Sequence, residues 1–265
     1  MHAEEFLGLD RTDEPLRWSM PITDGIATRH NFLFGGCGLG AAVAAMEGEC
    51  DRPVVWATAQ YLSFAMTGEV MDLDVIVAVS GKMTTQARVV AHVGNREILT
   101  VNVALGEKPL PYDEQWVTMP EVPSPGDCPL RSDLVADGKS IMSRFDMRLA
   151  MGTPWDAFDG TPAPGARSAL WVHTPEVEMS AAAIAILGDY VPFGISQAFG
   201  DWIPSNSLDN TIRVHRLEPT EWVLCDVRID SVSRGFGHGS VYLWTESGKL
   251  LATASQSAVL HRAKD

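Results

Sequence analysis

The sequence predicts an α+β protein in which two antiparallel sheets each wrap around one central helix. Two observations support this fold class. A glycine- and alanine-rich segment precedes a set of strand-like segments, and the same order of elements returns later in the chain. The chain has 265 residues, 46% of them hydrophobic, which is enough to bury a substantial core in one or two domains.

The glycine- and alanine-rich segment is NFLFGGCGLGAAVAAM, residues 31–46. A phosphate-binding loop is one interpretation, but such a loop follows a strand, opens a helix and leads into a parallel βαβ unit. Here antiparallel strands follow, and no Gly-Lys-Ser/Thr completes the motif. The segment instead predicts a helix with very small side chains, slim enough for a strongly curved sheet to close around it. This is the hotdog arrangement.

Four strand-like segments follow this helix, and their spacing predicts an antiparallel meander. They are rich in β-branched residues, and the turn signals TGE, SGK and VGN separate them. Such short connections join antiparallel neighbours, because a parallel pair needs a long crossover. The segments are residues 53–64, 69–80, 84–93 and 96–105.

The second half repeats this order after a proline-rich segment at residues 106–130. A strand at 168–174 precedes an alanine-rich helix at 179–199, and four strand candidates follow at 206–216, 221–230, 237–246 and 248–260. Aligning Gly94 with Gly248 places Asn102 on Gln256, which indicates internal duplication. We therefore predict a double hotdog, with an N-terminal hotdog (1–107), a proline-rich linker (108–140) and a C-terminal hotdog (141–265) that carries the catalytic residues.

Charge and composition exclude several function classes. The net charge of −14 disfavours nucleic acid as a partner, because a polyanion is repelled by most of this surface. The four cysteines have no paired spacing, which argues against a metal site and predicts a reduced, cytoplasmic chain. No run of residues is long and apolar enough for a membrane span, and the acidic N-terminus does not read as a signal peptide.

The chain resembles the type II acyl-CoA thioesterases, the TesB-like proteins with a double hotdog fold. The resemblance covers residues 25–262 and is carried by FLFGGCGLGAAVAAM, by the strand text that follows it and by LLATASQSAVLHR near the C-terminus. It implies hydrolysis of acyl-CoA, without metal or organic cofactor, by a water held between an aspartate, a serine or threonine, and a glutamine. At the matching positions this chain has Asp189, Ser207 and Gln256.

The chemistry of these side chains fits the implied roles. Asp189 can accept a proton from water, while Ser207 and Gln256 can hydrogen-bond the same water and fix its direction. Each also has a structural interpretation: Asp189 can end a helix, Ser207 can start a strand, and Gln256 can be a buried amide that needs a partner. Departures from the family pattern, such as Ser-Ala after Gln256, leave the acyl group undefined.

Further residues are expected to bind the substrate. The N–H groups at the start of the slim helix, at Gly35, Gly36 and Gly38, are expected to stabilise the oxyanion. Trp202 in DWIP is expected to border the acyl tunnel. Arg216, together with Arg213 and Arg234, is a candidate for the CoA phosphates, although a solvated surface charge is the favoured interpretation for each one alone.

Two other functions are weighed against hydrolysis. A non-catalytic acyl-CoA or lipid-binding hotdog protein would keep the fold without turnover. A hydratase on the same fold is disfavoured, because DNTIRVH lacks the Asp-x-Asn-Pro-x-His constellation that such enzymes need. Exposed sheet edges and the duplicated architecture predict a homo-oligomer of undefined size.

Overall fold

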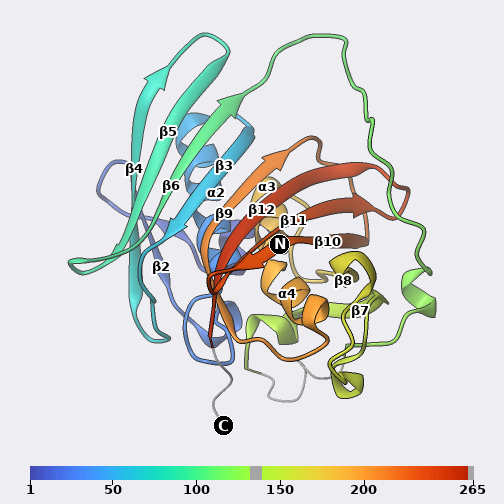
Figure 1. Ribbon diagram of the computed structural model, residues 1–265. Helices are drawn as coiled ribbons and strands as arrows, with labels where there is room; N and C mark the ends of the chain where they lie inside the picture. The colour runs from blue at the N-terminus through green and yellow to red at the C-terminus, as the bar shows by residue number, and fades with distance from the viewer. Residues whose placement is uncertain (132–138, 262–265) are drawn as a thin grey trace.

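The computed structural model describes residues 1–131 and 139–261 (Figure 1). Within these residues one twelve-stranded sheet has the order β1-β2-β4-β5-β6-β3-β9-β12-β11-β10-β8-β7, with every neighbouring pair antiparallel. Counted outward from the central pair β3–β9, the two halves of the sheet have matching strand orders, β3-β6-β5-β4-β2-β1 and β9-β12-β11-β10-β8-β7. The predicted α+β class and the duplication are both visible in this arrangement.

The bounds of the elements are as follows. The strands are β1 (Asp10–Arg11), β2 (Arg17–Pro21), β3 (Val54–Tyr61), β4 (Val70–Ser80), β5 (Thr84–Val93), β6 (Arg96–Gly106), β7 (Asp146–Met151), β8 (Arg167–His173), β9 (Ser205–Val214), β10 (Trp222–Ser233), β11 (Phe236–Thr245) and β12 (Leu250–Leu260). The α-helices are α1 (Ala3–Leu7), α2 (Gly35–Cys50), α3 (Ala181–Leu187) and α4 (Val191–Phe199). Short 3₁₀ turns are η1 (Asp24–Ile26), η2 (Pro125–Asp127), η4 (Ile141–Arg144), η5 (Trp155–Ala157) and η6 (Pro164–Ala166).

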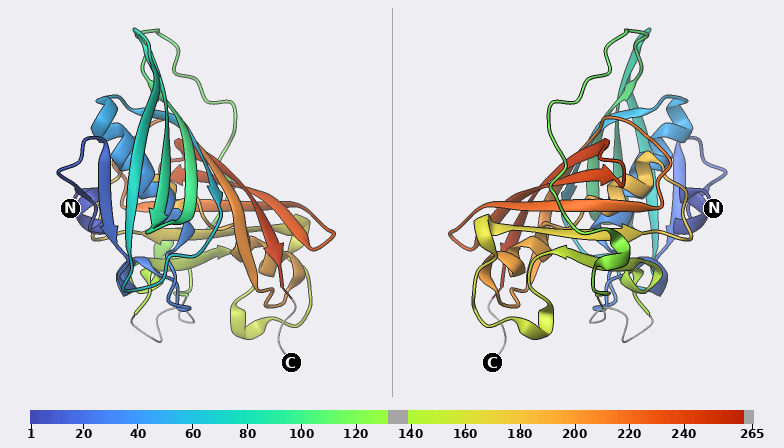
Figure 2. Two further views of the ribbon diagram at one scale, coloured as in Figure 1. Left: turned by 90° about the vertical axis from the view of Figure 1, so that its left-hand side faces the viewer. Right: turned by 90° about the vertical axis from the view of Figure 1, so that its right-hand side faces the viewer.

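The two predicted sheets are joined edge to edge into one. β3 and β9 pair antiparallel, and the hydroxyls of Thr58 and Thr211 lie 3.0 Å apart across the junction. Each half would otherwise expose an edge strand with unpaired N–H and C=O groups, so the pairing satisfies both edges at once. Figure 2 shows the strands of the second half running across those of the first, with α2 and α3 enclosed between them.

The small residues of α2 serve a close contact between helices. A Cβ atom added at Gly36 would lie 2.6 Å from the backbone oxygen of Ile186, and one at Gly40 would lie 2.9 Å from that of Ala182. Both distances are shorter than van der Waals contact, so only glycine lets α2 approach α3 this closely. The slim helix predicted from the sequence therefore packs against the helix of the second copy as well as against its own sheet.

The helix predicted at residues 179–199 is two helices, α3 and α4. They are separated by Gly188, Asp189 and Tyr190, and Pro192 occupies the first turn of α4. Proline lacks an N–H and its ring clashes with the carbonyl four residues earlier, here that of Gly188, so one continuous helix cannot run through this point. The stretch Ala181–Phe199 is long and apolar enough by composition to cross a membrane, but 83% of it is buried inside the protein, as expected of core helices.

The repeat alignment predicted at the glycines is wrong by one residue. The hairpins β5–β6 and β11–β12 each contain a bulge near the turn, and the partners beside it are separated by 8 positions in the first (Ala91 and Leu99) and by 9 in the second (Leu243 and Ala252). The second hairpin is therefore longer by one residue. Superposing the bulges makes Ser255 the counterpart of Asn102, and the counterpart of Gln256 is Val103.

The proline-rich segment covers the outer face of the second half. Gln115 accepts a hydrogen bond from the Leu250 N–H at 2.7 Å, and the Trp171 indole N–H donates to the Pro123 oxygen at 2.9 Å. Met119 and Val122 pack on a small apolar cluster that includes Trp171. Figure 1 shows this segment arching from the end of β6 to the second half. Residues 132–138 of the predicted linker and residues 262–265 of the predicted C-terminal hotdog lie outside the described residues.

Candidate active site

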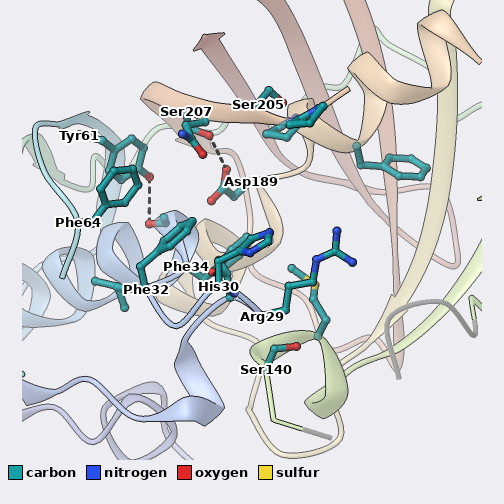
Figure 3. A pocket seen from close by; sticks show the side chains of 18 of the residues that line it. Arg29, His30, Phe32, Phe34, Tyr61, Phe64, Ser140, Asp189, Ser205 and Ser207 are labelled. Atoms are coloured by element: carbon teal, nitrogen blue, oxygen red, sulfur yellow. Dashed lines mark hydrogen bonds between the residues drawn. The ribbon is translucent and has the colours of Figure 1, made fainter. Parts of the chain in front are cut away.

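A cavity of about 490 Å³ lies where the two halves meet (Figure 3). Its wall combines the segment that leads into α2, the end of β3, the break between α3 and α4, and the start of β9. Apolar and aromatic side chains make up most of the lining surface, which is typical of small-molecule sites. Asp189 is the only carboxylate among the described residues of this lining.

Asp189 is held in the break between α3 and α4 and is only 6% exposed. The Gly36 N–H donates to its Oδ2 at 2.7 Å, and the Ser207 hydroxyl donates to its Oδ1 at 3.3 Å. The Gln256 amide N–H also donates to Oδ1. Burial raises the pKa of Asp189 from 3.8 to about 6, while these donors act in the opposite direction. The result is a carboxylate that is ionised at neutral pH and more basic than a free one.

Gln256 presents its amide to Asp189 in one orientation. It lies on β12 and is 3% exposed. Its Oε1 accepts the Val191 N–H at 3.1 Å, and its Nε2 donates to the Ser207 Oγ at 3.1 Å. Because the oxygen is engaged by the first turn of α4, the NH₂ group must point at the carboxylate and the hydroxyl. The partner that a buried amide requires is thus Asp189, together with Ser207.

Ser207 reaches the cavity because of a β-bulge in β9. Asp209 pairs with Ser257 and Ser207 pairs with Ala258, so Leu208 has no partner of its own on β12. Side chains alternate between the two faces of a strand, and one extra residue reverses that alternation. The bulge therefore directs Leu208 to solvent, where it is 39% exposed, and turns Ser207 toward Asp189.

The first half supplies the N-terminus of α2 to this site. The Tyr61 hydroxyl donates to the Gly35 oxygen at 3.0 Å and so holds the first residue of the helix. A Cβ atom at Gly35 would lie 2.8 Å from Asp189 Oδ2, so the backbone must be glycine to come this close. Among the described residues no acceptor takes the Gly35 N–H, and Gly35 lines the cavity. One helix-end donor thus binds the carboxylate, and the next remains open to a ligand.

Comparison with known proteins places this site in a family. The sequence profile of the family described as acyl-CoA thioesterase C-terminal domain matches residues 125–260. The chain belongs to the acyl-CoA thioesterase family. It is a thioester hydrolase. Asp189, Ser207 and Gln256 all lie within the matched residues. A search of curated proteins found no match.

Solved structures agree with this family and confirm the predicted fold. A candidate thioesterase from Novosphingobium aromaticivorans is 31% identical over 96% of this chain and 98% of that one, with a TM-score of 0.84. An acyl-CoA thioesterase II, TesB2, from Mycobacterium marinum is 19% identical over 99% of both chains, with a TM-score of 0.77. A hot dog protein of unknown function from Alicyclobacillus acidocaldarius is 17% identical over 99% and 98%, with a TM-score of 0.85.

The structure brings together some of the predicted site residues of this thioesterase and separates others. Asp189, Ser207 and Gln256 meet as described, Gly35 and Gly36 adjoin them, and Trp202 lines the cavity. Gly38 does not line the cavity; it faces Leu99 and Leu33 inside the core, because it lies on another side of α2. Arg216 is also outside the cavity, where it pairs with Asp113 at 2.8 Å and with Glu218 at 3.3 Å.

Three polar residues of the cavity wall, among others, were not predicted as site residues from the sequence: Tyr61, Arg29 and His30. Tyr61 was expected only as part of a strand, since an aromatic residue in a β segment usually belongs to the core. Arg29 and His30, in TRHNF, lie on the wall just before α2. The available signal was charge: a basic pair directly before the helix start in a chain with an excess of 14 negative charges.

The first copy holds no second site of this kind. It repeats the bulge of β9 in β3, where Val54 pairs with Leu105 and Trp56 with Ala104, leaving Val55 unpaired. Superposing the two bulges makes Val54 the counterpart of Ser207, and Val103 is the counterpart of Gln256. Both valines are buried in the core, at 4% and 1% exposed. An apolar pair at these positions cannot orient a water, so the first copy, all of which the structure describes, has no equivalent of the three polar side chains.

Proposed function

We propose that this thioesterase hydrolyses acyl-CoA to a free acid and CoA, with Asp189, Ser207 and Gln256 as its catalytic residues. The observation that carries the proposal is the meeting of these three side chains from three separate elements: Asp189 and Ser207 line the cavity, and the Gln256 amide donates to both of them. Asp189 acts as general base on a water that Ser207 and Gln256 orient toward the thioester carbonyl.

The reaction balances without any further reactant. The water oxygen forms a bond to the carbonyl carbon while Asp189 takes a proton from that water. The carbonyl oxygen becomes an oxyanion, for which the open Gly35 N–H at the start of α2 is the proposed donor. When the tetrahedral intermediate collapses, the carbon–sulfur bond breaks and the CoA thiolate leaves with the proton that Asp189 held.

The electrostatics of Asp189 support its role as base. A general base works best when its pKa approaches the working pH while the group is still ionised. Burial raises the pKa of Asp189 to about 6, which meets both conditions at neutral pH. Gln256 and Ser207 limit this rise by donating hydrogen bonds to the ionised carboxylate.

Release of free thiol from a panel of acyl-CoA thioesters tests the proposal. The wild-type protein should release CoA, and Asp189→Asn should lower kcat/KM by about 10³-fold, within the range that general bases contribute. Asp209→Asn is the matched control, because that carboxylate lies on β9, two residues after Ser207, but accepts the Ser257 N–H at 2.8 Å, outside the cavity. Binding of acyl-CoA without thiol release would instead establish the non-catalytic alternative.

A further inference from the structure

The charges around the cavity are opposite in balance to those of the whole chain. The chain has 34 Asp and Glu against 20 Lys and Arg, yet the described lining contains Arg29 and Arg131 against the single carboxylate of Asp189, with His30 and His261 in addition. That carboxylate is buried, whereas Arg29, His30 and His261 are exposed. The solvent-facing part of the cavity wall, its rim, is therefore locally basic within an acidic protein.

Arg29 differs from most arginines of the described chain in having no carboxylate partner. Seven others form ion pairs with carboxylates, namely Arg11, Arg17, Arg96, Arg144, Arg167, Arg216 and Arg228. The Arg29 guanidinium instead lies over the Trp202 ring, 4.9 Å from its centroid. Stacking on a ring fixes the plane of the guanidinium but leaves its N–H donors at the edge, available to an anion.

A tight turn holds Arg29 in place at the rim. The Asn31 N–H donates to the Thr28 oxygen at 3.0 Å, and the Thr28 N–H donates to the Phe32 oxygen at 2.7 Å. Asn31 has a φ of 61°, the left-handed conformation that asparagine tolerates better than most residues. Figure 3 shows Arg29 and His30 on the side of the cavity opposite Ser205 and Ser207. The hydrogen bonds of the turn thus fix the backbone at Arg29, and the contact with Trp202 restrains its side chain.

We propose that Arg29 is the anchor for the phosphorylated nucleotide end of CoA. This inference rests on the proposed function and assigns the orientation of the substrate in the cavity. CoA carries its phosphates at the end farthest from the thioester, and those charges cannot enter an apolar interior without a large desolvation cost. The nucleotide end therefore stays at the rim, where Arg29 offers fork-shaped donors that match phosphate oxygens. The acyl group and the thioester extend inward to Asp189.

Two substrates that differ only in the nucleotide test this assignment: an acyl-CoA and the pantetheine thioester of the same acid. Arg29→Ala should raise KM for acyl-CoA about ten-fold with kcat nearly unchanged, the size expected for one charge-assisted hydrogen bond. KM for the pantetheine thioester should not change. Arg29→Lys should recover part of the loss, and added salt should raise KM for acyl-CoA more in the wild type than in Arg29→Ala.

Arg88→Ala is the matched control. Arg88 is an exposed arginine on β5 without a carboxylate partner, and it lies outside the cavity lining. Its loss changes the net charge equally, so a rise in KM for acyl-CoA in both variants would overturn the anchor. So would an unchanged KM in Arg29→Ala, or an equal rise with both substrates.

Titration with free CoA and with pantetheine separates this inference from the proposed function. If the wild type hydrolyses neither thioester, the proposed function fails. The anchor still stands in that case if Arg29→Ala weakens binding of CoA about ten-fold and leaves pantetheine binding unchanged. It falls if both proteins bind CoA equally.

Discussion

Replacing Asp189 by Asn should make the protein more stable at neutral pH while removing its activity. The ionised carboxylate is buried, and burial raises the pKa of Asp189 in the folded protein from 3.8 to about 6. A folded state that binds the proton more tightly than the unfolded state loses stability as the pH rises between those two values. Below about pH 4 both states are protonated, and the penalty is absent.

The size of the effect follows from the shift in pKa. A difference of about two pKa units corresponds to about 3 kcal/mol at 1.36 kcal/mol per unit, fully expressed above pH 6. Asparagine is never charged, so Asp189→Asn escapes this penalty. It cannot accept all the hydrogen bonds from Gly36, Gln256 and Ser207, which costs about 1 kcal/mol. The variant should therefore be more stable by about 2 kcal/mol at pH 8.

Thermal unfolding of both proteins at pH 4, 6 and 8 measures this difference. For a chain of this size about 2 kcal/mol raises Tm by roughly 4–8 °C. All other titrating groups are shared, so the difference between the two proteins isolates residue 189. The gap should disappear or reverse at pH 4. A variant that melts at or below the wild type at pH 8, or a gap that does not change with pH, would refute the electrostatic reasoning.

Three further predictions concern the pH profile, Tyr61 and Gly36. The kcat/KM of the wild type should rise with pH through about 6 as Asp189 ionises. In Gln256→Ala the midpoint of this pH–rate profile should move to higher pH, because the lost donor no longer lowers the pKa of Asp189. An unmoved midpoint would exclude that contact as an influence on the base. Tyr61→Phe removes the donor that holds the Gly35 oxygen, so steady-state kcat should fall several-fold with KM little changed, and unfolding should lose only about 1 kcal/mol. Tyr190→Phe, whose hydroxyl has a weak 3.9 Å contact with the Met147 sulfur, is its control, and an equal fall in both would argue against positioning by Tyr61. Gly36→Ala forces a Cβ atom to within 2.6 Å of a backbone oxygen and should destabilise the protein by about 2 kcal/mol in denaturant titrations. Gly126→Ala is its control and should be nearly neutral, because the nearest atom to its Cβ would lie at 3.9 Å. Equal stabilities of the two variants would contradict the contact between α2 and α3.

The fold was predictable because its signals are spread along the whole chain. The small residues of α2 and the short turns of the meander are local features, and each is visible without knowledge of the other half. The fusion of the halves into one sheet was not predictable. It depends on pairing between β3 and β9, strands that lie about 150 residues apart, and no local property of Thr58 or Thr211 indicates it.

The candidate site was predictable in its residue types but not in its geometry. The resemblance to a family indicated Asp189, Ser207 and Gln256. The direction of the Ser207 side chain depends on the bulge at Leu208, and the regular alternation of side chains along a strand does not predict that bulge. The break between α3 and α4 was hidden in an uninterrupted apolar run. The ion pair of Arg216 with Asp113 was not predictable, because Asp113 lies in the proline-rich segment, far from Arg216 along the chain.

The hydrogen bond from Gly36 to Asp189 has a consequence for how the duplicated gene could diverge. The second copy carries Asp189, Ser207 and Gln256, while the first copy has valines at the counterparts of Ser207 and Gln256 and supplies the Gly36 N–H that lowers the pKa of Asp189. A polypeptide that contained only the second copy would lack the Gly36 N–H, and the edge of β9 that pairs with β3 would have no partner strand. A substitution at the start of α2 is therefore expected to change the pKa of Asp189, 153 residues away. The two copies constrain each other's sequence for this reason.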